Sequence, residues 1–197
     1  MTTKATTKKT STSKTKETAS LNLPNNPLIF EIFNLASKQR SKAKKVEVLQ
    51  KYNHDALRML LIWNFDESIQ SALPDGVVPY SGYAEQTTSS GTLSTKITEE
   101  ARRMYETGSF SIGTSDKSAK TTLRKEYKHF YHFIRGGNNG LSSIRRETMF
   151  INLLEGLHPL EAEILCLVKD KKLSDKYNIT KEIVSEAFPQ IVWGNRS

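Results

Sequence analysis

The chain has 197 residues and a formal net charge of +8, which is enough length for one ordinary domain or two small lobes. Only 37% of its residues are hydrophobic, and no apolar run reaches the length of a transmembrane helix, so we expect no membrane segment. The one cysteine, Cys166, excludes an internal disulfide and a thiolate metal cluster, and its apolar neighbours are typical of a small buried side chain.

The first segment, residues 1–21, is predicted to be a disordered basic tail. Its first twenty residues hold five lysines and one glutamate, a charge of +4, and they include no aromatic residue. Such a segment cannot bury enough apolar surface to offset the entropy that it would lose on ordering. It also lacks the continuous apolar stretch of a signal peptide, so we expect a protein of the reducing cell interior.

Residues 22–85 carry helical patterns and are predicted to form an N-terminal helical lobe. Helices are expected from Asn26-Pro27, over 41–52, and from Asn53 or Asp55 through Trp63. The start of the second helix is strongly basic, with Lys38, Arg40, Lys42, Lys44 and Lys45 close together.

A polar stretch rich in Gly, Ser and Thr, 86–97, is predicted to be a flexible linker to a C-terminal helical lobe at 98–197. In this lobe, the apolar spacing of Leu123, Tyr127, Phe130, Tyr131 and Ile134 predicts one helix over about 118–134. Other helices are expected from Thr98, after a cap at Ser142 or Ser143, from His158-Pro159, near 173–177 and over 180–188. The sequence therefore predicts an all-α fold: a compact multi-helix domain with long polar loops and a disordered basic N-terminal tail.

The main candidate for function is the basic region between Lys117 and Arg146. These thirty residues contain eight lysines and arginines and one acidic residue, Glu126, which gives a net charge of +7. On the expected 118–134 helix, Lys117, Lys120, Arg124 and Lys128 are spaced by three or four residues and would form one stripe. The predicted nucleic-acid or phosphate contacts are Lys120, Arg124, Lys128, Arg135, Ser142, Ser143, Arg145 and Arg146.

Two interpretations of this region stay open. Arg145 and Arg146 would lie in the first turns of a helix, where cations oppose the helix dipole. An anion held by free backbone N–H groups, the serine hydroxyls and these arginines would explain their place. The alternative is a solvated helix face followed by a capped helix–loop–helix, because Gly136-Gly137 is also an ordinary helix C-cap.

The C-terminal stretch 173–187 has the pattern of a helix-turn-helix. Asn178 can take the left-handed turn position, Ile179 can fill the turn, and Thr180 can cap the second helix. The second helix would present Lys181 with two glutamates to a DNA groove, and glutamates repel phosphate. We therefore weigh DNA reading by this unit against a plain packed trihelical end, and favour the latter.

The sequence offers little for enzyme chemistry. His129 and His132 are three residues apart on one expected helix, but no third ligand has suitable spacing, so no metal site is predicted. Phosphate-binding glycine loops and a nucleophile elbow are missing from the sequence. We therefore expect no cofactor, no catalytic residue and a non-enzymatic protein.

Two blocks of the sequence resemble an uncharacterised protein family of T4-like tailed bacteriophages, especially marine phages. The blocks are 57–69 (LRMLLIWNFDESI) with 73–80 (LPDGVVPY), and 133–140 (FIRGGNNG) through 145–147 (RRE), 154–158 (LEGLH), 168–173 (VKDKKL) and 187–189 (AFP) to 193–194 (WG). The resemblance covers most of the body, but not the tail or the linker. It implies a viral protein made in the host bacterial cytoplasm, and it assigns no site residues.

Together these features favour a phage-encoded, non-enzymatic accessory protein that binds nucleic acid, or a nucleoprotein complex, through its basic surface. The alternative is a protein–protein adaptor or a virion structural component, whose acidic partner would contact the basic tail. The choice among DNA, RNA and protein partners, and the oligomeric state, stay open.

Overall fold

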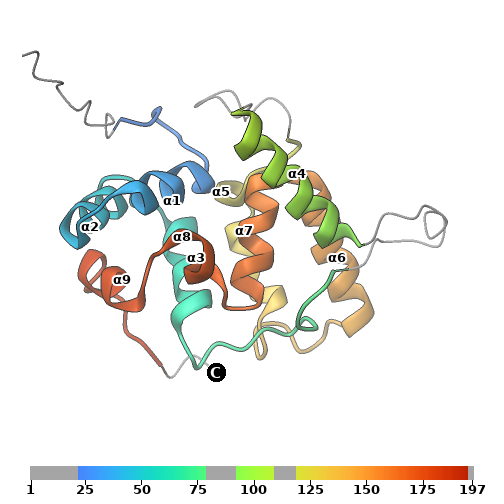
Figure 1. Cartoon of the computed structure of the whole chain (residues 1–197). Coiled ribbons are helices and arrows are strands. Elements are labelled where there is room, and N and C mark those ends of the chain that lie inside the picture. The colour runs from blue at the N-terminus through green and yellow to red at the C-terminus, as the bar shows by residue number, and fades with distance from the viewer. Residues whose placement is uncertain (1–21, 79–91, 109–118, 195–197) are drawn as a thin grey trace, which may run out of the picture.

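The computed structural model describes residues 22–78, 92–108 and 119–194, and all regular elements in these ranges are helices (Figure 1). In chain order they are α1 (Ile29–Lys38), α2 (Lys42–Lys51), α3 (Asp55–Phe65), α4 (Leu93–Thr107), α5 (Leu123–Glu126), the 3-10 helix η2 (Tyr127–Phe133), α6 (Ser143–Gly156), α7 (Pro159–Lys169), α8 (Leu173–Tyr177) and α9 (Lys181–Ala187). An isolated antiparallel bridge joins Ser71 and Ile134. The prediction of an all-α fold is confirmed.

Helix α7 lies at the centre of the fold, with α1, α3, α4, α6 and α8 packed around it (Figure 1). Most of its apolar residues are fully buried, on more than one face: Leu160, Ala162, Ile164, Leu165 and Val168. A helix that is apolar around most of its circumference must be covered on all sides to be stable. None of the helices in the described ranges is both long and apolar enough to cross a bilayer.

The two predicted lobes share one apolar core, since buried residues of 22–78 and of 92–194 belong to the same cluster. Helix α2 packs on α9, where the Lys45 Nζ donates to the Asn178 carbonyl at 2.7 Å. Helix α1 contacts both α7 and α8. The boundary placed in the linker therefore does not separate two cores.

The predicted linker, 86–97, extends too far into the next helix. Residues 86–91 lie outside the described part of the chain, whereas α4 starts at Leu93 rather than near Thr98. Thr92 caps it, with its Oγ1 accepting from the Thr95 N–H at 3.4 Å. Leu93, Ile97 and Ala101 are buried at a spacing of four, which is a helical period hidden among Ser and Thr residues.

The single helix predicted over 118–134 is wrong. The amides of Lys120 and Thr121 both donate to the Gly156 carbonyl, at 2.9 and 3.0 Å, and this keeps them outside a helix. α5 has only one turn, and the chain continues as the 3-10 helix η2. Three residues per turn place Phe130 and Phe133 on one buried face against Trp63, while Tyr131, expected to point inward, is exposed.

Candidate nucleic-acid interface

Arg146, in the first turn of α6, holds the glycine loop in place through three hydrogen bonds to backbone carbonyls. Its Nε donates to the His132 carbonyl at 2.7 Å, and its Nη2 donates to the carbonyls of Asn138 and Leu141 at 2.8 and 3.1 Å. The guanidinium thus closes the loop onto the start of α6. This contact network explains a cation in the first turn without any bound anion, in contrast to the prediction.

The two serines of this loop are both exposed, and one of them, Ser142, caps α6. Ser142 is the N-cap of α6, and its Oγ accepts from the Arg145 N–H at 3.4 Å, as expected for a capping serine. Ser143 and Arg145 are exposed at the first turn of α6. Of the two arginines predicted to bind an anion at this loop, only Arg145 is exposed, and Arg146 is partly buried.

Arg135 lies in a different neighbourhood. Its backbone N–H donates to the Gln70 carbonyl at 2.9 Å, and its Nη1 donates to Gln70 Oε1 at 3.2 Å. It shares a pocket with Lys171 and Lys172 near the end of α7, rather than with Arg124. The eight predicted contacts are thus divided among separate places and do not line one pocket.

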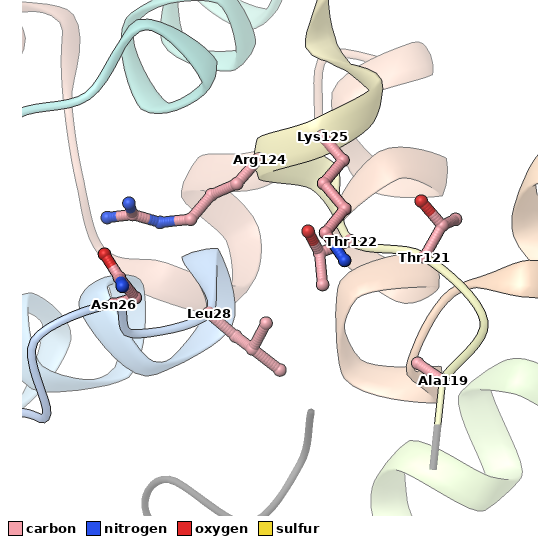
Figure 2. Close-up of a pocket in the computed structure, with 7 residues that line it drawn as sticks. All are labelled: Asn26, Leu28, Ala119, Thr121, Thr122, Arg124 and Lys125. Carbon is pink, nitrogen blue, oxygen red and sulfur yellow. The ribbon is translucent and has the colours of Figure 1, made fainter. Parts of the chain in front are cut away.

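A pocket of about 420 Å³ surrounds Arg124, between the start of α1 and the start of α5 (Figure 2). Figure 2 shows the Arg124 side chain extending toward Asn26, with Lys125 and the hydroxyls of Thr121 and Thr122 on the other side. The lining residues within the described chain are Asn26, Leu28, Ala119, Thr121, Thr122, Arg124 and Lys125. None of them is acidic, so this pocket, here called the Arg124 pocket, combines two cations with polar side chains that can donate hydrogen bonds.

A buried carboxylate fixes the two walls of the Arg124 pocket. Glu161, in the first turn of α7, is fully buried. Its Oε1 accepts from the Ile29 N–H and its Oε2 from the Leu123 N–H, both at 3.0 Å. These amides belong to the first residues of α1 and α5, where the helix dipole favours a negative charge. Glu161 therefore ties together the helix starts that carry Leu28 and Thr122 into the pocket.

The surface beside the pocket is positively charged. Lys120, Lys125 and Lys128 are all exposed. The one acid of this stretch, Glu126, accepts from the Thr121 Oγ1 at 2.6 Å. His54 lies near Arg124; burial is the main cause that lowers its pKa, and the Arg124 charge lowers it further. The nearby Asp55 carboxylate acts in the opposite direction and raises the His54 pKa.

The predicted stripe of cations does not form as a single helical face. Lys117 lies outside the described residues, and Lys120 precedes α5. Arg124 is on α5, while Lys128 is on the tighter turns of η2. What the structure retains of the predicted site is the local cluster of cations at 120–128.

The C-terminal helix-turn-helix has the expected backbone. Asn178 adopts the left-handed conformation (φ 43°) between α8 and α9, and Ile179 is fully buried in the turn. Part of the outer side of α9 is covered, because Trp193 Nε1 donates to Ser185 Oγ at 3.0 Å and the Lys181 ammonium lies 5.2 Å from the Trp193 ring. The part that stays exposed presents the glutamates Glu182 and Glu186, which repel phosphate. This cover favours the packed trihelical end over a helix that enters a DNA groove.

Other reactive side chains of the described residues have structural surroundings. The rings of His129 and His132 stack with centroids 6.2 Å apart, and a His132 ring nitrogen pairs with Asn138. Within the described ranges, no three His, Cys, Asp or Glu residues come together to hold a metal. Cys166 is partly exposed and packs against the core, and burial of its thiol raises the pKa to about 12.

A family model matches residues 32–119 and 109–175, more than half of the chain, and its description is a family of unknown function (DUF6433). The chain belongs to this family. The DUF6433 match includes Arg124, Lys125 and Glu161, whereas Asn26 and Leu28 precede it. Comparison with curated proteins and comparison with solved structures gave no match.

Proposed function

We propose that this DUF6433 protein binds nucleic acid through its phosphates, with the Arg124 pocket as the principal contact. The observation that carries the proposal is a pocket with two cations, two hydroxyls and an amide among its described lining residues, and no carboxylate. Arginine and lysine neutralise backbone phosphates, and the Thr122 hydroxyl and the Asn26 amide can add hydrogen bonds that orient the strand, whereas the Thr121 hydroxyl already donates to Glu126. We include in this proposal a non-enzymatic role, which rests on the lack of catalytic motifs in the sequence. We also include a phage origin with action in the host bacterial cytoplasm, which rests on the family resemblance.

Contacts of this kind give affinity with little sequence preference, because every nucleotide carries the same phosphate. The exposed Lys120 and Lys128 extend the positive surface on either side of the pocket along the chain. The basic tail, 1–21, would add further electrostatic attraction and would strengthen binding.

A paired charge-removal experiment tests the proposal. The double variant Arg124→Gln/Lys125→Gln should weaken binding of a fluorescent oligonucleotide by about a hundredfold, since each of the two lost charge-assisted contacts is worth about 1.5 kcal/mol or more. The matched control is Arg102→Gln/Arg103→Gln, which removes the same charge from the exposed face of α4. Equal losses in the two double variants would show general attraction to net charge and would overturn the assignment to this pocket.

The alternative, a protein–protein adaptor or virion component, is favoured by a separate apolar surface. Val77 is 62% exposed and lines a pocket of about 240 Å³ together with Leu73, Phe150 and Ile151. Ile144, on α6, is 78% exposed but is not one of the residues that line this pocket. Exposed apolar side chains beside a hollow are typical of protein contact sites. A pull-down from infected cells with and without nuclease separates the two functions, because partners that survive nuclease contradict binding through nucleic acid.

A further inference from the structure

A second hollow of about 510 Å³ lies on the surface between the loop after α3, the end of η2 and the end of α7. Three segments that are far apart in sequence supply its walls: 70–76, residue 135 and 169–172. We call it the Arg135 pocket. It shares no lining residue with the Arg124 pocket.

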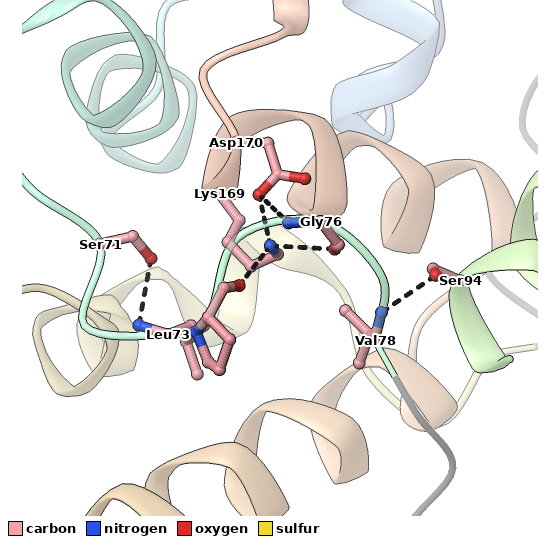
Figure 3. Close-up of polar contacts among 8 residues, drawn as sticks. Ser71, Leu73, Gly76, Val78, Ser94, Lys169 and Asp170 are labelled. Carbon is pink, nitrogen blue, oxygen red and sulfur yellow. Dashed lines mark hydrogen bonds and ion pairs between the residues drawn. The ribbon is translucent and has the colours of Figure 1, made fainter.

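One wall of the Arg135 pocket is held by a buried lysine (Figure 3). The Lys169 side chain is 1% exposed, and its Nζ donates to the carbonyls of Pro74 and Gly76 at 2.8 and 3.2 Å. The same ammonium pairs with the Asp170 carboxylate, which also accepts from the Gly76 N–H at 3.2 Å. Because every donor of the ammonium has an acceptor, this pair fixes the loop and carries no charge outward.

The opposite wall is fixed by backbone contacts. The Ala72 N–H donates to the Phe133 carbonyl at 2.8 Å, and the Arg135 N–H donates to the Gln70 carbonyl at 2.9 Å. Ser71 and Ile134 form the bridge between these two segments. The walls are therefore set before any ligand arrives, which reduces the entropy lost on binding.

The remaining charges around the Arg135 pocket are mostly positive. With Lys169 and Asp170 neutralised by each other, three cations face one carboxylate: Arg135, Lys171 and Lys172 against Asp75. The net charge of these four side chains is +2, and the Lys171 ammonium already donates to the Asp66 carbonyl at 2.6 Å, near the carboxylates of Asp66 and Glu67. Arg135 adds a planar fork of N–H donors, only one of which is directed to Gln70 Oε1.

We propose that the Arg135 pocket binds a phosphomonoester. Such a group carries a charge of about −1.5 to −2 at pH 7, which matches the pocket, whereas an internal backbone phosphate carries one charge. Its oxygens accept the donors of Arg135 and Lys172, and Gln70 and Ser71 at the wall donate to whatever the phosphate is attached to. The source is either a free nucleotide or the terminal phosphate of a nucleic acid strand.

The experiment is a titration of isotope-labelled full-length protein with inorganic phosphate and then with a nucleoside monophosphate, followed by NMR amide shifts. The expected shifts are at Gly76, Arg135 and Lys172, and Arg135→Gln should weaken binding at least about fivefold. Shifts confined to residues 119–126 would overturn this proposal while supporting the Arg124 pocket, so the two proposals fail separately. An oligonucleotide with a 5′-phosphate, compared with the same strand ending in a hydroxyl, distinguishes the two sources of the ligand.

Two substitutions that each remove one negative charge test the pocket in the opposite direction, because one of them should tighten phosphate binding. Asp75→Asn removes the carboxylate at the pocket mouth and should tighten phosphate binding severalfold. Glu99→Gln, on the exposed side of α4, adds the same charge elsewhere and should leave the affinity unchanged. Equal tightening by both substitutions, or none by Asp75→Asn, would contradict binding in this pocket.

Discussion

Glu161 is the residue on which the Arg124 pocket most depends, and its substitution gives a quantitative prediction. Its two carboxylate oxygens accept from the amides of Ile29 and Leu123, 132 and 38 residues away in the chain. An amide left buried without an acceptor costs about 1–3 kcal/mol. Glu161→Ala removes both acceptors, so we expect it to lower the free energy of unfolding by about 4 kcal/mol.

Glu161→Gln should cause about half of this loss in the free energy of unfolding. The amide side chain keeps one oxygen, so one of the two helix-start amides retains its acceptor while the other faces an NH₂ group. We expect a loss of about 2 kcal/mol, half that of the alanine variant. Urea unfolding followed by circular dichroism measures both values, and the exposed Glu155→Gln on α6 is the matched control. A Glu161→Gln loss below about 0.5 kcal/mol would refute the reasoning that this carboxylate joins α1 to α5.

Three further predictions concern stability. Lys169→Met should lower the free energy of unfolding by about 3 kcal/mol, because it leaves the Asp170 carboxylate and two carbonyls without their donor; an unchanged urea midpoint would contradict this. Arg146→Lys should cost about 1–2 kcal/mol, since one ammonium cannot reproduce the three carbonyl contacts, and thermal unfolding measures it against Arg145→Lys. Burial lowers the pKa of His158 below 6.5, and its Nδ1 accepts from a backbone amide, so the unfolded chain binds a proton at a higher pH than the folded chain does. The free energy of unfolding should therefore fall as the pH drops below 6.5. Urea unfolding at several pH values measures this dependence, and His158→Asn should flatten it.

Sequence patterns predicted the local structure well where a chain segment determines its own conformation. The cap at Ser142, the start at His158-Pro159 and the left-handed turn at Asn178 all depend on neighbouring residues, and the structure has each of them. The same logic failed for the aromatic stretch 127–133, where the spacing fits both an α-helix and a 3-10 helix. Packing of Phe130 and Phe133 against Trp63, which is distant in sequence, favours the 3-10 form.

The candidate site is only partly predictable from the sequence, because the charge of a side chain does not indicate which groups its charged end contacts. The count of cations correctly drew attention to Arg124, but it gave Arg146 the same weight, although Arg146 is held by three carbonyls. Asn26-Pro27 predicts a helix start, whereas α1 begins at Ile29 with Leu28 as its N-cap, and Asn26 lines the pocket. Lys125 belongs to the basic stretch but is not among the predicted contacts.

The basic pair at the end of α7 shows the same limit in another form. Lys171 and Lys172 follow a helix C-terminus, where cations are expected for local reasons alone. Their proximity to Arg135 arises from the loop at 70–76, which is joined to Arg135 by a backbone hydrogen bond and to the end of α7 by the side chains of Lys169 and Asp170. No spacing in the sequence indicates this proximity, since 36 and 37 residues separate Lys171 and Lys172 from Arg135.

The salt dependence of oligonucleotide binding tests the central claim most directly. Fluorescence anisotropy between 50 and about 300 mM salt gives the slope of log affinity against log salt concentration, which is about −0.7 per contacted phosphate for a single strand and −0.9 for a duplex. We predict a steep slope for the natural chain that becomes shallower by about one contact in Lys125→Gln and stays the same in Arg102→Gln. A binding constant independent of salt, or a slope that Lys125→Gln leaves unchanged, would contradict phosphate binding at the Arg124 pocket.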